Sequence, residues 1–267
     1  FEKLCALFSP KKRTPVQVEV LDLPGFDSQT DPKLQTAAMN EVRKADGMAI
    51  VLDLFGPEAG GQALAALTRA WEEIVFADYA IVSKGIENVE MAAKSKHNTD
   101  AERRHTFLLS LIGPLESGAG LRNVTLSPDA EKLVRQYGLL TRRPILAIAN
   151  LAEEDLAAPA GNPAVVGLRA FCDARRWPLF LLSAKVEAEI GLLDQADRAE
   201  LLASYHLEEP GLHRFLRHAY SALNLITFFT VGEDEVRGWT VRRDSPARQA
   251  AGVIHSDLER GFIRGEV

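Results

Sequence analysis

An apolar run that stops abruptly at polar residues constrains the fold of this chain more than any other feature. Ile145–Ala149 is short, continuous and apolar, and Pro144 precedes it. This pattern is typical of a strand that is buried on both faces of a parallel sheet. Asn150 follows at the point where the strand would end. Because ligands bind at the carboxyl ends of strands in open α/β sheets, the residues after this run are candidates for a binding site.

Two further apolar runs end in the same way. A strand predicted over residues 16–21 leads into Asp22–Gly25, and Leu179–Leu182 leads into Ser183–Lys185. The carboxyl ends of parallel strands meet at one edge of a sheet, so the three polar loops together indicate one nucleotide site. Each loop has an ordinary alternative: an Asp-x-Pro-Gly turn, an acidic helix start at Glu153 without a ligand, and a simple strand-to-loop turn.

The three loops resemble the later motifs of P-loop NTPases. Asp22–Gly25 is similar to the D-x-x-G loop, and Ser183–Lys185 is similar to the S-A-K loop behind the base. Asn150–Glu153 resembles the base-reading loop, in N-x-x-E form instead of N-K-x-D. Their order and the glutamate resemble the YchF/Obg-like ATPases. Four C-terminal segments resemble the TGS domain of that family: Leu223–Gly232, Glu235–Thr240, Gln249–Asp257 and Arg260–Arg264.

The resemblance implies roles for single residues. Asp22 would hold a water bound to Mg²⁺, and the Gly25 amide would face the γ-phosphate, an approach that favours a residue without Cβ. The Asn150 side chain and the backbone near Leu151 would read adenine. Ser183, Ala184 and Lys185 would place a backbone amide and the lysine stem near the base.

Glu153 weakens the case for GTP as the ligand and permits ATP. In N-K-x-D loops the aspartate accepts hydrogen bonds from guanine N1–H and the 2-amino group, and adenine offers neither donor. A glutamate is one methylene longer and is poorly placed for this pair of bonds. The resemblance to the YchF/Obg-like ATPases implies a nucleotide-dependent switch that binds and slowly hydrolyses ATP, and GTP less well, with the ribosome or translation machinery as partner. The alternative is a ribosome- or RNA-binding module without hydrolysis.

Two features depart from a complete NTPase. Phe26 stands where many GTPases carry a polar side chain that orients water, and Asp27–Lys33 replaces a Gly- and Lys-rich segment. The chain also contains no G-x-x-x-x-G-K-[ST] phosphate loop, which relatives carry upstream of the region corresponding to Phe1. We expect this absence to reflect truncation, and we expect the fragment alone to be inactive.

The pattern of elements predicts an α/β fold with a helical hairpin, and the resemblance implies that the sheet is that of a P-loop NTPase, that the hairpin is an insertion in it, and that a partial β-grasp domain follows. The expected domains are residues 1–77 with 143–222 for nucleotide binding, 78–142 for the insertion and 223–267 for the TGS domain. The TGS part should form strands over 226–231 and 236–241, a helix over 247–257 and a strand over 262–266, with one sheet edge unpaired.

Charge and cysteine content narrow the function classes. The net charge of −6 and the pI of about 5.6 argue against wholesale coating of nucleic acid. The tip of the predicted hairpin contains four basic residues, Lys94, Lys96, Arg103 and Arg104. They could form a local basic surface for an RNA or the ribosome, or they could simply be the solvated end of the hairpin. The two cysteines form no disulfide framework or metal spacing. No apolar run approaches the roughly 18 residues of a membrane helix. We expect a cytoplasmic protein.

Overall fold

The computed structural model describes residues 1–25, 31–54, 59–93 and 99–266 of the chain. Contacts divide it into a larger unit, Pro24–Phe215, and a smaller unit that joins Phe1–Leu23 to Leu216–Val267. Residues 1–23, which the sequence assigned to the nucleotide-binding domain, thus group by their contacts with the C-terminal residues. The predicted α/β class is confirmed, because the larger unit contains a parallel sheet with helices packed on it.

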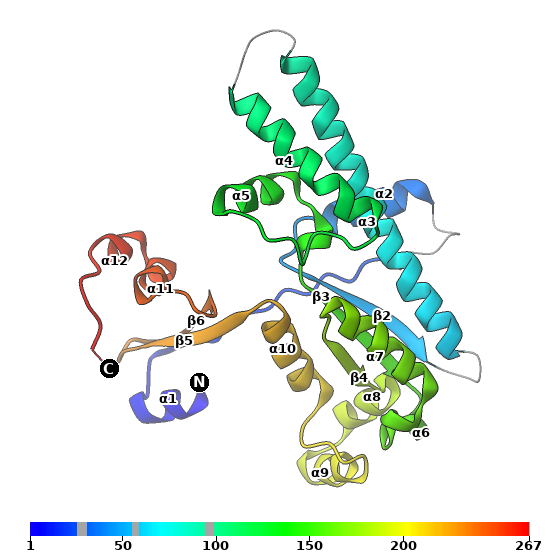
Figure 1. Ribbon diagram of the computed structural model, residues 1–267. Coiled ribbons are helices and arrows are strands. Elements are labelled where there is room, and N and C mark those ends of the chain that lie inside the picture. Colours follow the sequence, from blue (N-terminus) through cyan, green and yellow to red (C-terminus); the bar gives the residue numbers. More distant parts are fainter. Residues whose placement is uncertain (26–30, 55–58, 94–98, 267) are drawn as a thin grey trace. The chain divides into compact units, whose positions relative to one another are not determined.

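The sheet of the larger unit has the strand order β2-β3-β4 (Figure 1). Its strands are β2 Met48–Leu54, β3 Ile145–Leu151 and β4 Leu179–Leu182. β3 lies in the middle, and its side chains from Ile145 to Ala149 are buried as predicted. The apolar run over residues 48–53 predicts a buried strand, but β2 is buried only in part. Its burial alternates along the strand, Val51 is 63% exposed, and α3 packs against it.

Helices surround this sheet and extend away from it (Figure 1). They are α2 Pro32–Val42, α3 Ala59–Ala93, α4 Thr99–Glu116, α5 Pro128–Tyr137, α6 Glu153–Leu156, α7 Pro163–Arg175, α8 Ala184–Leu192, α9 Gln195–Ser204 and α10 Gly211–Ala222, with 3-10 turns at Leu140–Arg142 and Pro159–Gly161. α5 begins as the sequence predicts: the Ser127 side chain accepts a hydrogen bond from the amide of Ala130, and a proline occupies the first turn.

The predicted helical hairpin is formed by α3 and α4, which pack along each other (Figure 1). Leu108, Leu111 and Leu115 are buried between them, as their spacing predicts. α3 is one continuous helix of 35 residues, so the expected domain boundary after residue 77 falls inside it. Lys94 and Lys96 of the predicted basic tip lie outside the described residues, whereas Arg103 and Arg104 are exposed on α4.

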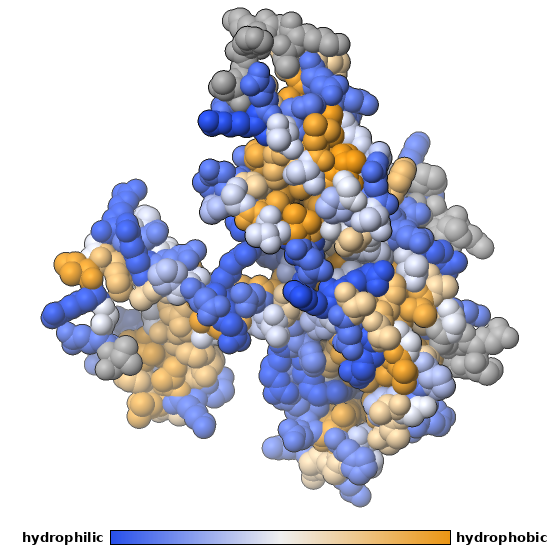
Figure 2. All heavy atoms as spheres, in the orientation of Figure 1, coloured by the Kyte–Doolittle hydropathy of each residue, from blue (hydrophilic) through white to orange (hydrophobic). Residues whose placement is uncertain are grey.

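Apolar side chains also reach the surface of the hairpin. Phe76, Met91 and Leu109 are each about half exposed or more, and apolar surface is visible in this region in Figure 2. None of the helices in the described part of the chain has the length and apolar composition that crossing a membrane requires.

The smaller unit contains a three-stranded sheet with the order β1-β6-β5. Its elements are α1 Glu2–Phe8, β1 Lys12–Thr14, β5 Leu225–Val231, β6 Glu235–Arg242, α11 Ala247–Ile254 and α12 Ser256–Arg260. The predicted hairpin of β5 and β6 is confirmed. The sequence predicted no strand over residues 12–14 and left one edge of the sheet unpaired; in the structure β1 pairs in parallel with β6.

Three predicted elements differ in the structure. Residues 16–21 and 262–266 form no strand, and the expected helix over 247–257 is broken at His255. A strand needs a neighbour that pairs with its backbone, and no described residue pairs with either segment. Val20 is 68% exposed and Ile263 is 92% exposed, so neither segment has the burial of a core strand.

Candidate functional site

Asn150 lies at the carboxyl edge of the parallel sheet, near the end of the central strand. In the strand register it is opposite Asp53 of β2 and Leu182 of β4. The Asn150 Nδ2 donates to Asp53 Oδ1 at 3.0 Å, and the Asn150 Oδ1 accepts from the Ala184 amide at 2.9 Å. One amide side chain therefore connects all three strand ends. The structure brings together two of the three loops that the sequence singled out.

Glu153 and Lys185, the last residues of these two loops, are also in contact. The Lys185 Nζ donates to Glu153 Oε2 at 2.6 Å. The other carboxylate oxygen, Oε1, accepts from the Tyr205 hydroxyl at 2.6 Å. Glu153 is the first residue of the short helix α6, so the acidic helix start considered for this loop is present as well.

These contacts change the acid–base properties of the three side chains. The pKa of Glu153 is lowered, first by the hydrogen bond from Lys185 and then by that from Tyr205. The same bonds to the Glu153 carboxylate raise the pKa of Lys185 and the pKa of Tyr205. A carboxylate that accepts two hydrogen bonds is favoured in its charged form. Around neutral pH the site therefore contains a charged, fixed carboxylate.

The remaining predicted residues of these loops are buried. Leu151 is 0% exposed and ends β3, and Ser183 is 0% exposed directly before α8. The Ser183 Oγ has no hydrogen-bond partner among the described residues. A buried hydroxyl without a partner is uncommon and calls for a ligand, a water or a functional explanation. It lies in the loop whose Ala184 amide bonds to Asn150.

The D-x-x-G loop runs across the boundary between the two units. Asp22 is exposed and belongs to the smaller unit, whereas Gly25 belongs to the larger one. A Cβ built on Gly25 would meet no described atom within 4 Å other than its chain neighbours, so its backbone is open to approach. Phe26 and most of the segment after it lie outside the described residues.

Asp22 could supply one of the ligands that a Mg²⁺ ion needs. Within the described ranges, no group of three or more His, Cys, Asp or Glu side chains could hold a metal ion. Mg²⁺ at nucleotide sites is commonly held by one or two carboxylates together with waters and substrate phosphates. The Asp22 carboxylate suits that arrangement, in which the phosphates supply the other ligands.

Sequence reasoning missed two residues of this site. Asp53 lies 97 positions from Asn150, and Tyr205 lies 52 positions from Glu153. A polar residue at the end of the predicted strand Met48–Asp53 was a usable signal for Asp53. Tyr205 follows a helix and belongs to no motif, so nothing in the local pattern pointed to it.

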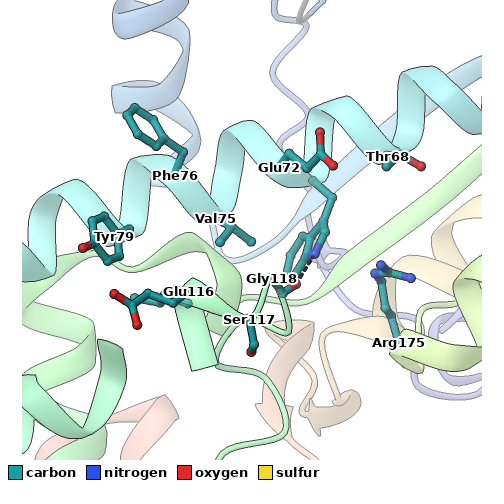
Figure 3. Close-up of a pocket in the computed structure, with 11 residues that line it drawn as sticks. Thr68, Glu72, Val75, Phe76, Tyr79, Glu116, Ser117, Gly118 and Arg175 are labelled. Atoms are coloured by element: carbon teal, nitrogen blue, oxygen red, sulfur yellow. Dashed lines mark hydrogen bonds between the residues drawn. The ribbon is translucent and has the colours of Figure 1, made fainter. Parts of the chain in front are cut away.

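A separate cleft of about 520 Å³ lies between α3, the end of α4 and α7 (Figure 3). Trp71, Val75 and Leu115 contribute to its apolar lining, and the indole Nε1 of Trp71 donates to the Gly118 carbonyl at 2.8 Å. In Figure 3, Arg175 lies at one end and Glu116 towards the other. None of the site residues predicted from the sequence lines this cleft.

Comparison with known proteins gives consistent matches over the chain. Residues 225–267 match the family model YchF-GTPase_C, described as a protein of unknown function (DUF933). The chain is 33% identical to the ribosome-binding ATPase YchF of Bacillus subtilis, over 99% of this chain and 74% of that protein. It is 28% identical to the Obg-like ATPase 1 of Schizosaccharomyces pombe, over 100% of this chain and 71% of that protein.

A solved structure agrees with this result. The structure of the Schizosaccharomyces pombe YchF GTPase superimposes with a TM-score of 0.81 at 25% sequence identity, covering 98% of this chain and 73% of that one. The agreement supports the P-loop NTPase fold class that the strand-end loops predict. On the sequence identity and its coverage, the chain belongs to the YchF/Obg-like ATPase family.

Proposed function

We propose that this chain carries the base-reading part of a nucleotide site and acts as a nucleotide-dependent switch that uses ATP, and GTP less well. The observation that carries the proposal is the hydrogen bond between the Asn150 Oδ1 and the Ala184 amide at 2.9 Å. It joins the N-x-x-E loop to the S-A-K loop at the carboxyl edge of a parallel sheet, the place where nucleotides bind in open α/β folds. The names of the relatives support the same activity.

Asn150 fits the role of a base reader because its amide is held in one orientation. Its oxygen accepts from Ala184, and one of its two N–H groups donates to Asp53. An amide side chain has two donor hydrogens and two acceptor lone pairs, so a donor and an acceptor site remain for a base edge. We propose that adenine uses these sites together with the backbone near Leu151, and that Ser183 and Lys185 lie behind the base.

At the phosphate end we propose that Asp22 acts on Mg²⁺ through water and that Gly25 senses the γ-phosphate. Hydrolysis in this class also needs a phosphate loop, whose backbone and lysine hold the phosphates. The 267 residues contain no such motif. We therefore propose that these residues alone bind nucleotide without turning it over, and that slow hydrolysis belongs to a protein that also contains a phosphate loop.

We retain the domain assignment as part of this proposal. Residues 1–77 with 143–222 would serve nucleotide binding, 78–142 would be the helical insertion, and 223–267 would be the TGS domain. The family model that matches residues 225–267 lies within the last of these ranges.

Equilibrium dialysis of the 267-residue chain with labelled ATP and GTP tests the proposal. We expect ATP to bind more tightly than GTP, and Asn150→Ala to weaken ATP binding by about 10-fold or more, since a hydrogen bond at a buried polar edge is worth about 1–2 kcal/mol. Asn40→Ala, an exposed asparagine on α2, is the matched control. Equal binding of ATP by the Asn150 variant, or no ATP binding by the parent chain, would refute the proposal.

We also propose that the protein docks on the ribosome, because several relatives are named ribosome-binding ATPases. Arg103 and Arg104 are exposed on α4 and supply positive charge for contact with an RNA surface. Co-sedimentation with ribosomes at low salt, with and without ATP, tests this proposal. We expect Arg103→Glu with Arg104→Glu to reduce pelleting and Arg69→Glu, an exposed residue of α3, to leave it unchanged. Binding that ignores nucleotide would favour the alternative module without hydrolysis.

A further inference from the structure

The contact between Tyr205 and Glu153 has no counterpart in the sequence motifs of the site. Tyr205 follows α9 directly, and its hydroxyl donates to Glu153 Oε1 at 2.6 Å. Lys185 donates to the other oxygen, Oε2, also at 2.6 Å. Both carboxylate oxygens of the base-reading loop are therefore engaged by donors from the protein itself.

Of the two partners, Tyr205 is the better anchor. The Lys185 side chain is 64% exposed and the Glu153 side chain is 35% exposed, so solvent screens their ion pair and a flexible lysine holds it loosely. Tyr205 is half-buried and has only two side-chain torsions to restrain. A hydrogen bond from a neutral donor to a carboxylate is also stronger than one between two neutral groups.

The backbone that carries Tyr205 is fixed to the rest of the site. Its amide donates to the Leu202 carbonyl, and the Leu207 amide donates to the same carbonyl at 2.8 Å, which closes the end of α9. Arg198 of α9 donates to the Ile190 and Leu193 carbonyls at the end of α8. Because α8 starts directly after Ser183, Tyr205 is connected to the S-A-K loop through two helices.

The contacts of Glu153 bear on whether the site accepts adenine or guanine. Guanine presents two donors, N1–H and the 2-amino group, which need a carboxylate facing them; adenine presents neither. Each Glu153 oxygen retains a lone pair, so the number of acceptors does not exclude guanine. Tyr205 and Lys185 instead restrain the orientation of the carboxylate, and a carboxylate that cannot turn to face guanine cannot accept from both of its donors.

We propose that Tyr205 is a positioning residue that sets base specificity by holding the Glu153 carboxylate away from the base, with Lys185 as its partner. This inference rests on the proposed nucleotide site. It assigns to a residue outside every motif the discrimination between adenine and guanine nucleotides. Without the Tyr205 hydroxyl, only the solvent-screened ion pair with Lys185 restrains Glu153, which can then turn and accept from guanine.

Competition between ATP and GTP for the 267-residue chain tests this role, with a fluorescent adenine nucleotide as the displaced probe. We expect Tyr205→Phe to raise GTP affinity relative to ATP affinity by about 10-fold, the effect of one added hydrogen bond to a charged group. Lys185→Met should shift the ratio in the same direction by less. Tyr79→Phe, a tyrosine of α3 outside this site, is the control and should leave the ratio unchanged.

The outcomes separate this inference from the proposed function. A general structural defect in Tyr205→Phe would weaken ATP and GTP binding alike and leave their ratio unchanged. An unchanged ratio in a chain that still binds ATP overturns the role of Tyr205 and leaves the nucleotide site standing. Failure of the parent chain to bind the adenine probe overturns the nucleotide site, and the specificity role with it.

Discussion

At the scale of single residues, the Glu153 carboxylate is the most informative group, because its pH dependence follows from its partners. Lys185 and Tyr205 donate to it and lower its pKa, while Glu154 and Glu189 add negative charge near those partners. The folded pKa is below the unfolded one, so the stabilisation is present above the ordinary carboxyl pKa. It is lost as the pH falls through the lowered folded value.

We expect the Glu153 carboxyl carbon, followed by ¹³C NMR against pH, to titrate below the ordinary glutamate value of about 4.3. Tyr205→Phe and Lys185→Met should each raise the midpoint, because each removes one donor to the charged form. A parent midpoint at or above the ordinary value would show that neither donor holds the carboxylate in solution.

Cys172 of α7 gives a second residue-scale prediction. It is fully buried, and burial together with the nearby Asp173 raises the pKa of its thiol to about 11. The thiolate is the reactive form, so at pH 8 the reactive fraction is about 100-fold lower than for a thiol with a pKa of 9. Iodoacetamide should leave native Cys172 unmodified by mass spectrometry and modify it in urea. Rapid native labelling would contradict its burial.

Local motifs identified some residues of the site, but not the residues that hold them. Asn150, Ser183 and Lys185 stand at strand ends, where the rule for open α/β sheets makes polar residues conspicuous. Asp53 and Tyr205 reach the site from distant parts of the chain. Only the three-dimensional pairing of strands and helices reveals their contacts.

At the scale of elements, the spacing of apolar residues predicted most of the helices and the strands β3 and β4. β3, β4 and the α3–α4 packing follow from apolar runs and apolar faces that are visible in the chain. The segments 16–21 and 262–266 have strand-like composition and form no strand. Composition gives only a tendency, because the hydrogen bonds of a strand come from its neighbours.

The junction between α3 and the turn before β3 is organised by one buried aspartate. Asp78 is 0% exposed, and its carboxylate accepts from the amides of Leu140 and Thr141 at 2.9 and 2.7 Å. The Arg43 Nη1 donates to it at 3.1 Å. This cluster connects the hairpin helix α3 to the segment that leads into the central strand β3. It therefore helps to fix the strand that carries Asn150 at its other end.

We expect Asp78→Ala to lower the free energy of unfolding by about 3–5 kcal/mol, because it leaves two buried amides without their acceptor and removes the ion pair with Arg43, whose guanidinium keeps only the Gly138 carbonyl among the described residues. Urea denaturation followed by circular dichroism measures the change. The matched control is Asp129→Ala, whose side chain is 93% exposed on α5 and should cost less than about 1 kcal/mol. Equal losses for the two variants would contradict the structural role of Asp78.

At the scale of the whole molecule, α10 is the element that continues from the larger unit into the smaller one. It starts at Gly211, whose amide donates to the Glu187 carboxylate at 2.7 Å, and Arg214 donates to the same carboxylate at 3.0 Å. Glu187 lies in the first turn of α8, directly after the S-A-K loop. The helix that joins the units is thus bonded to the helix that follows the candidate site.

Membership of the family follows from the likeness along the full chain, whereas the nucleotide site rests on a few contacts at the edge of one sheet. The sequence predicted the class of fold and the three strand-end loops. The structure adds the bonds among Asn150, Asp53 and Ala184 that make two of those loops one site. A bound base would therefore lie close to the Asn150 side chain and the Ala184 backbone amide.

The most direct measurement is an NMR titration of the ¹⁵N-labelled 267-residue chain with adenosine and with guanosine. We expect adenosine to shift the amide signals of Leu151, Ala184 and Lys185 in a saturable way, guanosine to shift them less, and Asn150→Ala to abolish the effect. Unchanged signals at these amides, or equal shifts with guanosine, would contradict an adenine site at this edge of the sheet.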